Sequence, residues 1–255
     1  MNNIINIFGK EIPLYGLLFF AGIILASCAA LPLAKKRGFD LYDIAASAAY
    51  AMIGAIVGAK LLFIVVSIKE IIELELSLLA IIKGGFVFYG GLIGGAIGIL
   101  IYIKQYRLDP SVFDIYAAVL PLGHALGRVG CFFAGCCYGI PHDGFASVVY
   151  TSTMGLTPLN EPLLAIQLIE AACLLLLFAV QILVFCLSKR DAKGLQTSLY
   201  LCIYPVMRFV LEFFRGDRER GILLGLSTAQ WVSIAIFALT WIFIIRKKIK
   251  ETNSI

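Results

Sequence analysis

The sequence predicts an all-α integral membrane protein with about seven transmembrane helices. Of its 255 residues 61% are hydrophobic and 15% are charged, and the mean hydropathy is +0.95. Soluble domains have about 45–50% apolar and about 25% charged residues. A helix needs about 20 apolar residues to cross the bilayer core. Seven stretches meet this length, at residues 12–34, 43–68, 84–103, 111–130, 162–187, 195–214 and 227–245.

The first stretch is expected to be a retained helix. Asn2, Asn3 and Asn6 precede it instead of a basic region, and Lys35-Lys36-Arg37 follow it without a small-residue cleavage site. A secretory signal peptide has the opposite features. The second and third stretches are joined by residues 69–77, which are expected to form a short amphipathic segment on the membrane surface.

Glycines dominate the third stretch, between residues 83 and 98. Small residues let helix backbones approach closely, which is the expected role of Gly94, Gly95 and Gly98. Gly90 and Gly91 follow Tyr89 at the outer end of this stretch. A backbone without side chains also leaves room for a lipid headgroup, so both roles stay open there.

Lysine and arginine orient the predicted helices. Twelve of these residues fall on one side, which the positive-inside rule makes cytoplasmic, so the N-terminus is expected outside and the C-terminus inside. They also explain the net charge of +5 without nucleic acid. No linker or internal repeat divides the chain, so residues 1–255 are expected to form one membrane domain. The inner basic residues are Lys35, Lys36, Arg37, Lys104, Arg107, Lys189, Arg190, Lys193, Arg246, Lys247, Lys248 and Lys250.

The sixth stretch carries a polar stripe near its outer end. Tyr204, Arg208, Glu212 and Arg215 are spaced by four, four and three residues, which places them on one helix face. Arg208 and Glu212 are expected to pair. Ionisable residues inside a membrane helix are functional candidates, although a purely structural ion pair is the alternative. Further outer arginines are Arg128, Arg218 and Arg220.

The fourth stretch adds His124 and Arg128, four residues apart on one face. His124 is either a hydrogen-bonded helix contact or a base or headgroup donor. Asp114 is expected near the cytoplasmic end without a catalytic role. A guanidinium binds phosphate through two parallel hydrogen bonds, so Arg128 and Arg208 are predicted to hold the headgroup of an anionic phospholipid.

Three of the seven cysteines, Cys131, Cys136 and Cys137, lie in the segment GRVGCFFAGCCYG at 127–139. The spacing does not match paired C-x2-C zinc motifs, and two adjacent cysteines are expected to suit one tetrahedral site poorly, so no metal is predicted. A disulfide from Cys131 to one of the pair, packing thiols, and a functional thiol activated by Arg128 remain open. Cys28, Cys173, Cys186 and Cys202 are interpreted as packing residues.

Four segments in this order resemble the prolipoprotein diacylglyceryl transferase family of bacterial plasma membranes. They are IPLYGLLFF (12–20), FYGGLIGG (88–95), GRVGCFFAGCCYG (127–139) and YPVMRFVLEFFRGD (204–217). The resemblance implies a multi-pass plasma-membrane enzyme without a cofactor. Its implied reaction transfers a diacylglyceryl group from phosphatidylglycerol to the thiol of a lipobox cysteine in a preprotein, releasing glycerol phosphate.

The resemblance also implies site residues. Arg128 matches the arginine of the family's GRxGN signature, and Arg208, Glu212 and Arg215 match its RFxxEFxR segment. Tyr15 matches a tyrosine in the first span. The glycines around the headgroup site are matched by Gly90, Gly91, Gly127, Gly130 and Gly139.

Several positions depart from the family pattern. Tyr89 replaces the histidine of HGGL, and Cys131 and Cys136 replace the asparagine and the glutamate that follow it in the signature. Lys60 stands where an arginine is expected, and Gln167 and Glu170 lack the histidine that normally precedes them. Either Tyr89 or His124 is expected to take the place of the missing histidine. These departures leave two alternatives: a phospholipid-dependent transferase with another acceptor, and a non-catalytic lipid-binding or redox membrane protein.

Overall fold

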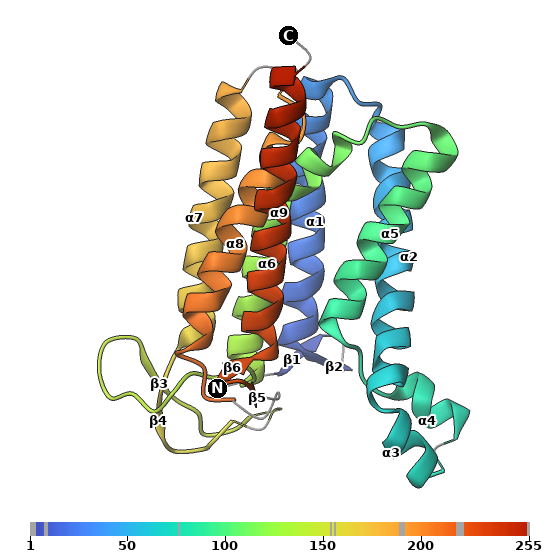
Figure 1. Ribbon diagram of the computed structural model, residues 1–255. Helices are drawn as coiled ribbons and strands as arrows, with labels where there is room; N and C mark the ends of the chain where they lie inside the picture. Colours follow the sequence, from blue (N-terminus) through green and yellow to red (C-terminus); the bar gives the residue numbers. More distant parts are fainter. Residues whose placement is uncertain are drawn as a thin grey trace. The chain divides into compact units, whose positions relative to one another are not determined.

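The computed structural model describes residues 4–7, 10–75, 77–153, 155, 157–188, 192–217 and 222–253. Long α-helices make up most of these residues (Figure 1). The chain divides into two compact units, one of residues 1–33 with 113–255 and one of residues 34–112. Each unit is described by itself. The sequence predictions on Asn2, Asn3, Lys189, Arg190, Arg218 and Arg220 lie outside the described residues.

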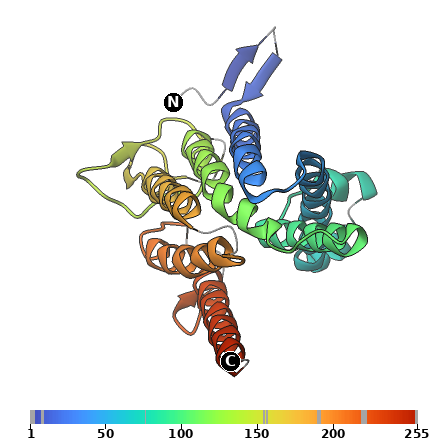
Figure 2. The ribbon, with the colours of Figure 1, turned by 90° about the horizontal axis from the view of Figure 1, so that it is seen from above.

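The larger unit is built from long helices and short antiparallel strand pairs. In Figure 2 these helices are seen along their axes, and α8 lies between α7 and α9. The three strand pairs β1–β2, β3–β4 and β5–β6 lie at one end of the unit (Figure 1). The helices are α1 (Leu14–Arg37), α6 (Val112–Ala134), α7 (Ile166–Leu187), α8 (Leu195–Glu212) and α9 (Thr228–Asn253). The strands are β1 (Ile4–Ile7), β2 (Lys10–Pro13), β3 (Ser147–Val149), β4 (Pro162–Leu164), β5 (Ile222–Leu223) and β6 (Leu226–Ser227).

Small residues bring these helices together. A Cβ on Gly22 of α1 would lie 2.9 Å from the carbonyl oxygen of Gly123 in α6, so the two backbones touch here. Buried Ala125, Ala171 and Leu174 form an apolar cluster between α6 and α7. Close packing of this kind replaces the hydrophobic driving force that is weak between helices in lipid. It fixes α6 and α7, which carry much of the candidate site.

Asp114 organises the start of α8 across the fold. Its side chain is 1% exposed and accepts hydrogen bonds from the backbone N–H groups of Gly194 (2.6 Å) and Thr197 (3.0 Å) and from the Thr197 hydroxyl (2.8 Å). A carboxylate at a helix N-terminus satisfies unpaired N–H groups and interacts favourably with the helix dipole. Asp114 therefore acts as a helix cap from a distant segment, a role that its interfacial assignment from sequence did not include.

The smaller unit consists of α2 (Leu41–Val66), α3 (Ile68–Glu73), α4 (Leu78–Lys83) and α5 (Phe88–Tyr106). Helices α2 and α5 run side by side (Figures 1 and 2) and meet through glycines. A Cβ on Gly94 would overlap the carbonyl oxygen of Gly54, and one on Gly98 would overlap that of Tyr50. The predicted helix-contact role of Gly94 and Gly98 is confirmed. Helix α3 starts one residue before the short segment expected over 69–77.

Lys60 of α2 closes the end of α4. Its Nζ donates to the carbonyl oxygens of Ile81 (3.2 Å), Ile82 (3.2 Å), Gly84 (2.9 Å) and Gly85 (3.1 Å), and lies 4.2 Å from the centre of the Phe86 ring. A cation is favourable at carbonyls left unpaired at a helix C-terminus. The lysine that departs from the family pattern thus has a structural role in this unit.

Five helices in the described part of the chain are long and apolar enough to cross a membrane. They span Leu14–Arg37, Leu41–Val66, Val112–Ala134, Ile166–Leu187 and Thr228–Arg246. The predicted all-α class agrees with these helices. The remaining predicted spans correspond to α5 and α8, and their crossing of the membrane stays a prediction. The orientation of the chain in the membrane and its single domain also stay predictions. The β1–β2 hairpin was not predicted, because its residues 4–13 combine short apolar runs with charged residues.

Candidate functional site

Arg128 lies on α6 and pairs with an acid from the neighbouring helix α7. Its Nη2 is 3.0 Å from Oε1 of Glu170, and the two side chains are 13% and 2% exposed. In the described part of the chain, the Nε of Arg128 is buried without a hydrogen-bond partner. Glu170 was not among the predicted site residues. Its presence inside a very apolar helix was the signal, since a buried carboxylate requires a partner.

Arg208 on α8 has a similar arrangement. Its Nη2 lies 2.5 Å from Oε2 of Glu212, one turn later, so the predicted pair is confirmed. The other oxygen of Glu212 accepts a hydrogen bond from the Ser227 hydroxyl at 2.9 Å. Within the described residues, Nη1 of Arg208 is buried and has no hydrogen-bond partner. Both predicted phosphate-binding arginines thus keep a buried N–H donor unused.

Arg215 does not continue the helical stripe, contrary to the prediction from spacing. Helix α8 ends at Glu212, and Arg215 forms an isolated β-bridge with Gly139. Its guanidinium binds both oxygens of Asp217, at 2.8 and 2.6 Å, and its Nε lies 3.7 Å from Glu212. Burial opposes the charge of Arg215, but the hydrogen bonds to Asp217 outweigh it and raise the arginine's pKa. Glu212 therefore lies next to two guanidinium groups, from Arg208 and Arg215.

His124 connects the two phosphate-binding candidates. The charges of both Arg128 and Arg208 act on its imidazole, and its ring centre lies 5.4 Å from that of Tyr204. Arg128 also interacts electrostatically with Tyr204. Because the charges of two guanidinium groups, from α6 and α8, both act on this histidine, the two arginines lie in the same region of the unit. Their shared effect on His124 supports the prediction that Arg128 and Arg208 converge.

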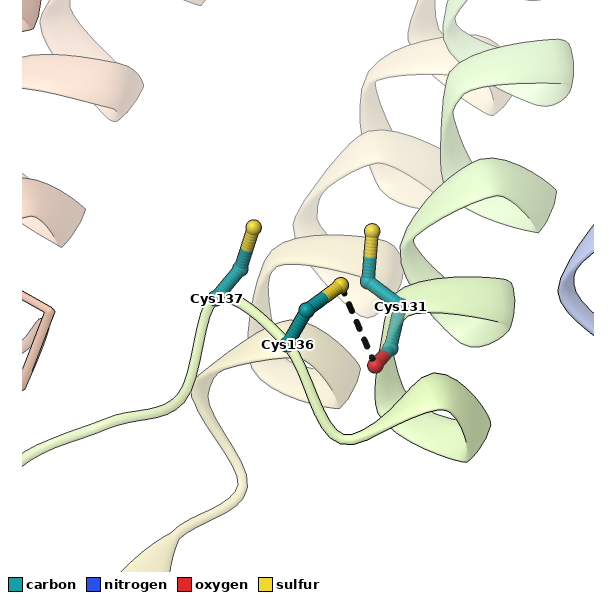
Figure 3. Close-up of side chains that lie close together, drawn as sticks. All are labelled: Cys131, Cys136 and Cys137. Carbon is teal, nitrogen blue, oxygen red and sulfur yellow. Dashed lines mark hydrogen bonds between the residues drawn. The ribbon is translucent and has the colours of Figure 1, made fainter. Parts of the chain in front are cut away.

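The three cysteines of the 127–139 segment form a cluster at the end of α6 (Figure 3). Their Sγ atoms all lie within 4.8 Å of one another, and none of the three forms a disulfide. Adjacent Cys136 and Cys137, which were expected to suit one site poorly, both place their Sγ atoms close to that of Cys131. Cys137 has a left-handed backbone with φ +57°. In extended chain neighbouring side chains point to opposite sides, whereas this conformation turns both thiols toward Cys131.

Polar side chains hold the segment that carries these thiols. The carbonyl oxygen of Gly135 accepts from the hydroxyls of Thr153 (2.8 Å) and Thr157, and Gln167 donates to the carbonyl oxygen of Cys136 at 2.8 Å. Tyr150 donates to the carbonyl oxygen of Phe132 at 3.1 Å, and burial raises its pKa to about 12, so it stays a donor. Gln167, left over from the family pattern in the sequence, thus positions the cysteine loop.

The cluster favours a single negative charge. Hydrogen bonds from Cys131 and Cys136, together with the charges of Arg215 and Arg128, hold the pKa of Cys137 well below its ordinary value. The same hydrogen bonds and burial raise the pKa of Cys136. Thiolate is the nucleophilic and metal-binding form of cysteine. These interactions therefore favour the thiolate form of Cys137, and the charges of Arg215 and Arg128 contribute to this.

The predicted glycines differ in their surroundings. Gly130 packs against Tyr15, whose ring carbon Cδ2 would lie 3.1 Å from an added Cβ, while Gly127 has open space around it. Gly139 lies tightly against the carbonyl of Leu164. Tyr89, Gly90 and Gly91 belong to the smaller unit. Gly90 touches the backbone of Gly58, which gives it a helix-contact role, and an added Cβ at Gly91 would meet nothing closer than 3.5 Å. Headgroup binding by Gly90 and Gly91 stays a prediction.

The comparison with protein families places the whole chain. The model of the prolipoprotein diacylglyceryl transferase family matches residues 2–246. The chain belongs to this family. It is accordingly an α-helical, multi-pass membrane protein, in agreement with its apolar helices.

Relatives in several bacteria match nearly the whole chain. A phosphatidylglycerol–prolipoprotein diacylglyceryl transferase of Clostridium tetani is 37% identical over 230 residues, which cover 90% of each chain. A second is from Clostridium perfringens, with 33% identity covering 91% of this chain and 89% of the relative. A third, from Dehalococcoides mccartyi, is 32% identical, and the match covers 94% of this chain and 91% of the relative. The family resemblance drawn from four short segments is therefore confirmed along the chain.

Proposed function

We propose that this protein transfers a diacylglyceryl group from phosphatidylglycerol to the thiol of a preprotein lipobox cysteine in a bacterial plasma membrane. The family and the names of the relatives support this reaction and its two substrates. Apolar helices long enough to span a bilayer support the location. In the proposed orientation the N-terminus lies outside, so the site at the C-terminal end of α6 faces the outer leaflet.

One observation carries the proposal for the donor site. Arg208 is buried and the Arg128 side chain is 13% exposed. Both arginines act on the same histidine, and each keeps one buried N–H donor without a partner in the described structure. An unsatisfied buried donor costs about 1–3 kcal/mol, and more when it is charged. The oxygens of one phosphodiester satisfy both donors at once. Phosphatidylglycerol supplies such a group, with a negative charge that matches the guanidinium groups.

The reaction follows from this charge arrangement. A thiolate attacks the glyceryl carbon of the lipid, the new C–S bond forms, and the C–O bond to phosphate breaks. Glycerol phosphate leaves with the electron pair, and the two arginines stabilise the charge that grows on it. Glu170 and Glu212 hold the arginines at 3.0 and 2.5 Å and orient their free donors toward the phosphate.

The other predicted residues also have proposed roles in the reaction. Tyr15, Gly127, Gly130, Gly139 and Arg215 border the headgroup, while Cys131 and Cys136 lie on the acceptor side. Tyr89 and His124 are the two candidates that replace the family histidine. A comparison of Tyr89→Phe with His124→Gln distinguishes them, because only the residue that serves the reaction lowers kcat when it is changed.

A reconstituted assay tests the proposed function. Purified protein is incubated with phosphatidylglycerol and a synthetic lipobox peptide, and the peptide is analysed by mass spectrometry. We expect a diacylglyceryl mass increment on the cysteine peptide and none on the matched peptide with serine in its place. Arg128→Ala is expected to abolish the product. Lack of product with a folded wild-type protein, while Arg128→Ala still weakens phosphatidylglycerol binding, contradicts the acceptor and leaves the donor site standing.

A further inference from the structure

The three-cysteine cluster has the geometry of a metal site. Zn–S bonds are about 2.3 Å long, so sulfurs that share one zinc lie about 3.7–4.0 Å apart. The Sγ atoms of Cys131, Cys136 and Cys137 already lie within 4.8 Å of one another. Figure 3 shows Cys131 on the last turn of α6 and the other two on the loop that returns past it. Zinc binding requires these sulfurs to approach one another by about 1 Å at most.

The surrounding backbone keeps the cluster in this arrangement without a metal. Gly135 and Cys137 both have left-handed φ angles, of +64° and +57°, and thereby fold the loop back toward Cys131. The Thr153 hydroxyl and the Gln167 amide fix the carbonyl groups of Gly135 and Cys136. A site organised before binding loses little conformational entropy when the ligand arrives. These contacts act together with the Cys136 thiol, which donates to the carbonyl oxygen of Cys131 at 3.7 Å (Figure 3), and they hold the three thiols together.

The local charge favours a thiolate complex. Three thiolates around a divalent cation give a net charge of −1. Arg128 interacts electrostatically with Cys131 and Cys137, and Arg215 acts on Cys137. Both guanidinium groups therefore stabilise the anionic complex, while a hydrated cation alone is repelled by them. Soft thiolate ligands select zinc over magnesium or calcium.

We propose that Cys131, Cys136 and Cys137 bind one Zn²⁺ ion as thiolates and leave its fourth coordination position open to a thiol from a second molecule. In the described part of the chain, the three cysteines are the only group of three or more His, Cys, Asp or Glu residues close enough to share a metal ion. Three protein ligands with an open fourth position are the arrangement of catalytic rather than structural zinc sites.

The open position deepens the proposed function and rests on it. A thiol that coordinates zinc loses its proton, which passes to solvent, and becomes a thiolate at neutral pH. The acceptor cysteine bound there is deprotonated beside Arg128, the residue proposed to hold the donor phosphate. The metal-bound thiolate attacks the glyceryl carbon, and glycerol phosphate leaves with the electron pair of the broken C–O bond.

Cobalt provides a direct readout of the metal site. Protein reduced with a phosphine, in phosphatidylcholine nanodiscs, is titrated with Co²⁺. We expect one Co²⁺ per chain, a thiolate-to-cobalt absorption band in the near ultraviolet, and displacement by Zn²⁺. Each single alanine variant of the cluster is expected to bind at least about 10-fold more weakly, since even outer-shell changes cost that much. A matched variant that replaces Cys28, Cys173, Cys186 and Cys202 is expected to bind like wild type.

Two results overturn the metal site. The first is that reduced wild-type protein, whose circular dichroism shows native helix content, takes up no Co²⁺. The second is undiminished binding by the folded triple serine variant. Because the readout is absorption in the absence of phosphatidylglycerol, it does not depend on transferase activity.

The acceptor position has its own test on the cobalt-loaded protein. A lipobox peptide is expected to strengthen the thiolate-to-cobalt band, and the serine peptide to leave it unchanged. Identical spectra with both peptides overturn the open acceptor position. A spectral change with the cysteine peptide but no diacylglyceryl product in the reconstituted assay refutes the proposed reaction and retains the metal site.

Discussion

Replacement of Arg208 by lysine separates the geometry of the guanidinium group from its charge. Arg208 is 7% exposed, its Nη2 lies 2.5 Å from Glu212, and its Nη1 is buried without a hydrogen-bond partner in the described structure. A lysine keeps the positive charge, and its ammonium group can contact Glu212 as a compact point charge. It cannot bind the carboxylate and a phosphate oxygen through separate, fixed donors. We therefore expect Arg208→Lys to fold and to bind the donor lipid poorly.

The expected magnitude follows from one lost hydrogen bond. A hydrogen bond that involves a charged group contributes about 1.5–3 kcal/mol. Since about 1.4 kcal/mol corresponds to a factor of ten, kcat/KM for phosphatidylglycerol should fall by roughly 10- to 150-fold. The KM for the lipobox peptide should stay within about twofold, because the acceptor does not contact this donor in the proposed site.

The assay measures initial rates in detergent micelles with the two substrates varied separately. Arg107→Lys is the matched control, because Arg107 is exposed at the end of α5 and the chemical change is the same. The control should leave both kinetic constants unchanged. If Arg208→Lys retains wild-type kcat/KM for phosphatidylglycerol, or affects only the peptide KM, the assignment of its free donor to the phosphate is wrong.

Three further predictions concern packing, capping and pH. Gly94→Ala places a Cβ against the Gly54 backbone and should destabilise the protein by about 1–3 kcal/mol in reversible unfolding. Gly91→Ala is the control: its added Cβ would meet nothing closer than 3.5 Å, so it should be neutral or stabilise the protein by up to about 1 kcal/mol. Equal effects of the two substitutions would refute the helix contact. Asp114→Asn should lower the free energy of unfolding by about 1–2 kcal/mol, because it removes the charged cap of α8. An unchanged thermal unfolding temperature would contradict this role. Between pH 8 and pH 6, alkylation of free cysteine slows roughly 80-fold. Because a lowered pKa preserves the thiolate as pH falls, alkylation of metal-free Cys137, followed by mass spectrometry, should slow clearly less than that, and an equal decline would refute the lowered pKa.

Local spacing predicted the parts of the site that local structure decides. Arg208 and Glu212 are one turn apart on a single helix, and the regular rise of that helix is sufficient to pair them. The same spacing failed for Arg215, because α8 ends at Glu212 and the following residues bridge to Gly139. The sequence offers no proline or strong C-cap at that point. The end of the helix is set by a pairing with a segment far away in the chain.

Contacts between helices account for most of what the sequence did not reveal. Glu170 pairs with Arg128 from another helix, and Asp114 caps α8 from α6, so neither partner is visible in local periodicity. The cysteine cluster depended on a left-handed residue other than glycine, at Cys137. Such a conformation is uncommon for cysteine, and adjacent residues are normally expected to point apart. Tertiary hydrogen bonds at Gly135 and Cys136 impose it.

The bridge between Gly139 and Arg215 bears on how this site tolerates sequence change. The backbone N–H of Ile140 donates to the carbonyl oxygen of Phe214 at 3.0 Å, and that of Gly216 donates to Tyr138 at 2.9 Å. These bonds join the cysteine loop to the end of α8 through main-chain atoms, which every residue except proline provides. The attachment of the loop to the end of α8 therefore does not depend on the side chains at 131, 136 and 137. A bacterial lineage can thus alter how the acceptor is handled without rebuilding the site that holds the lipid.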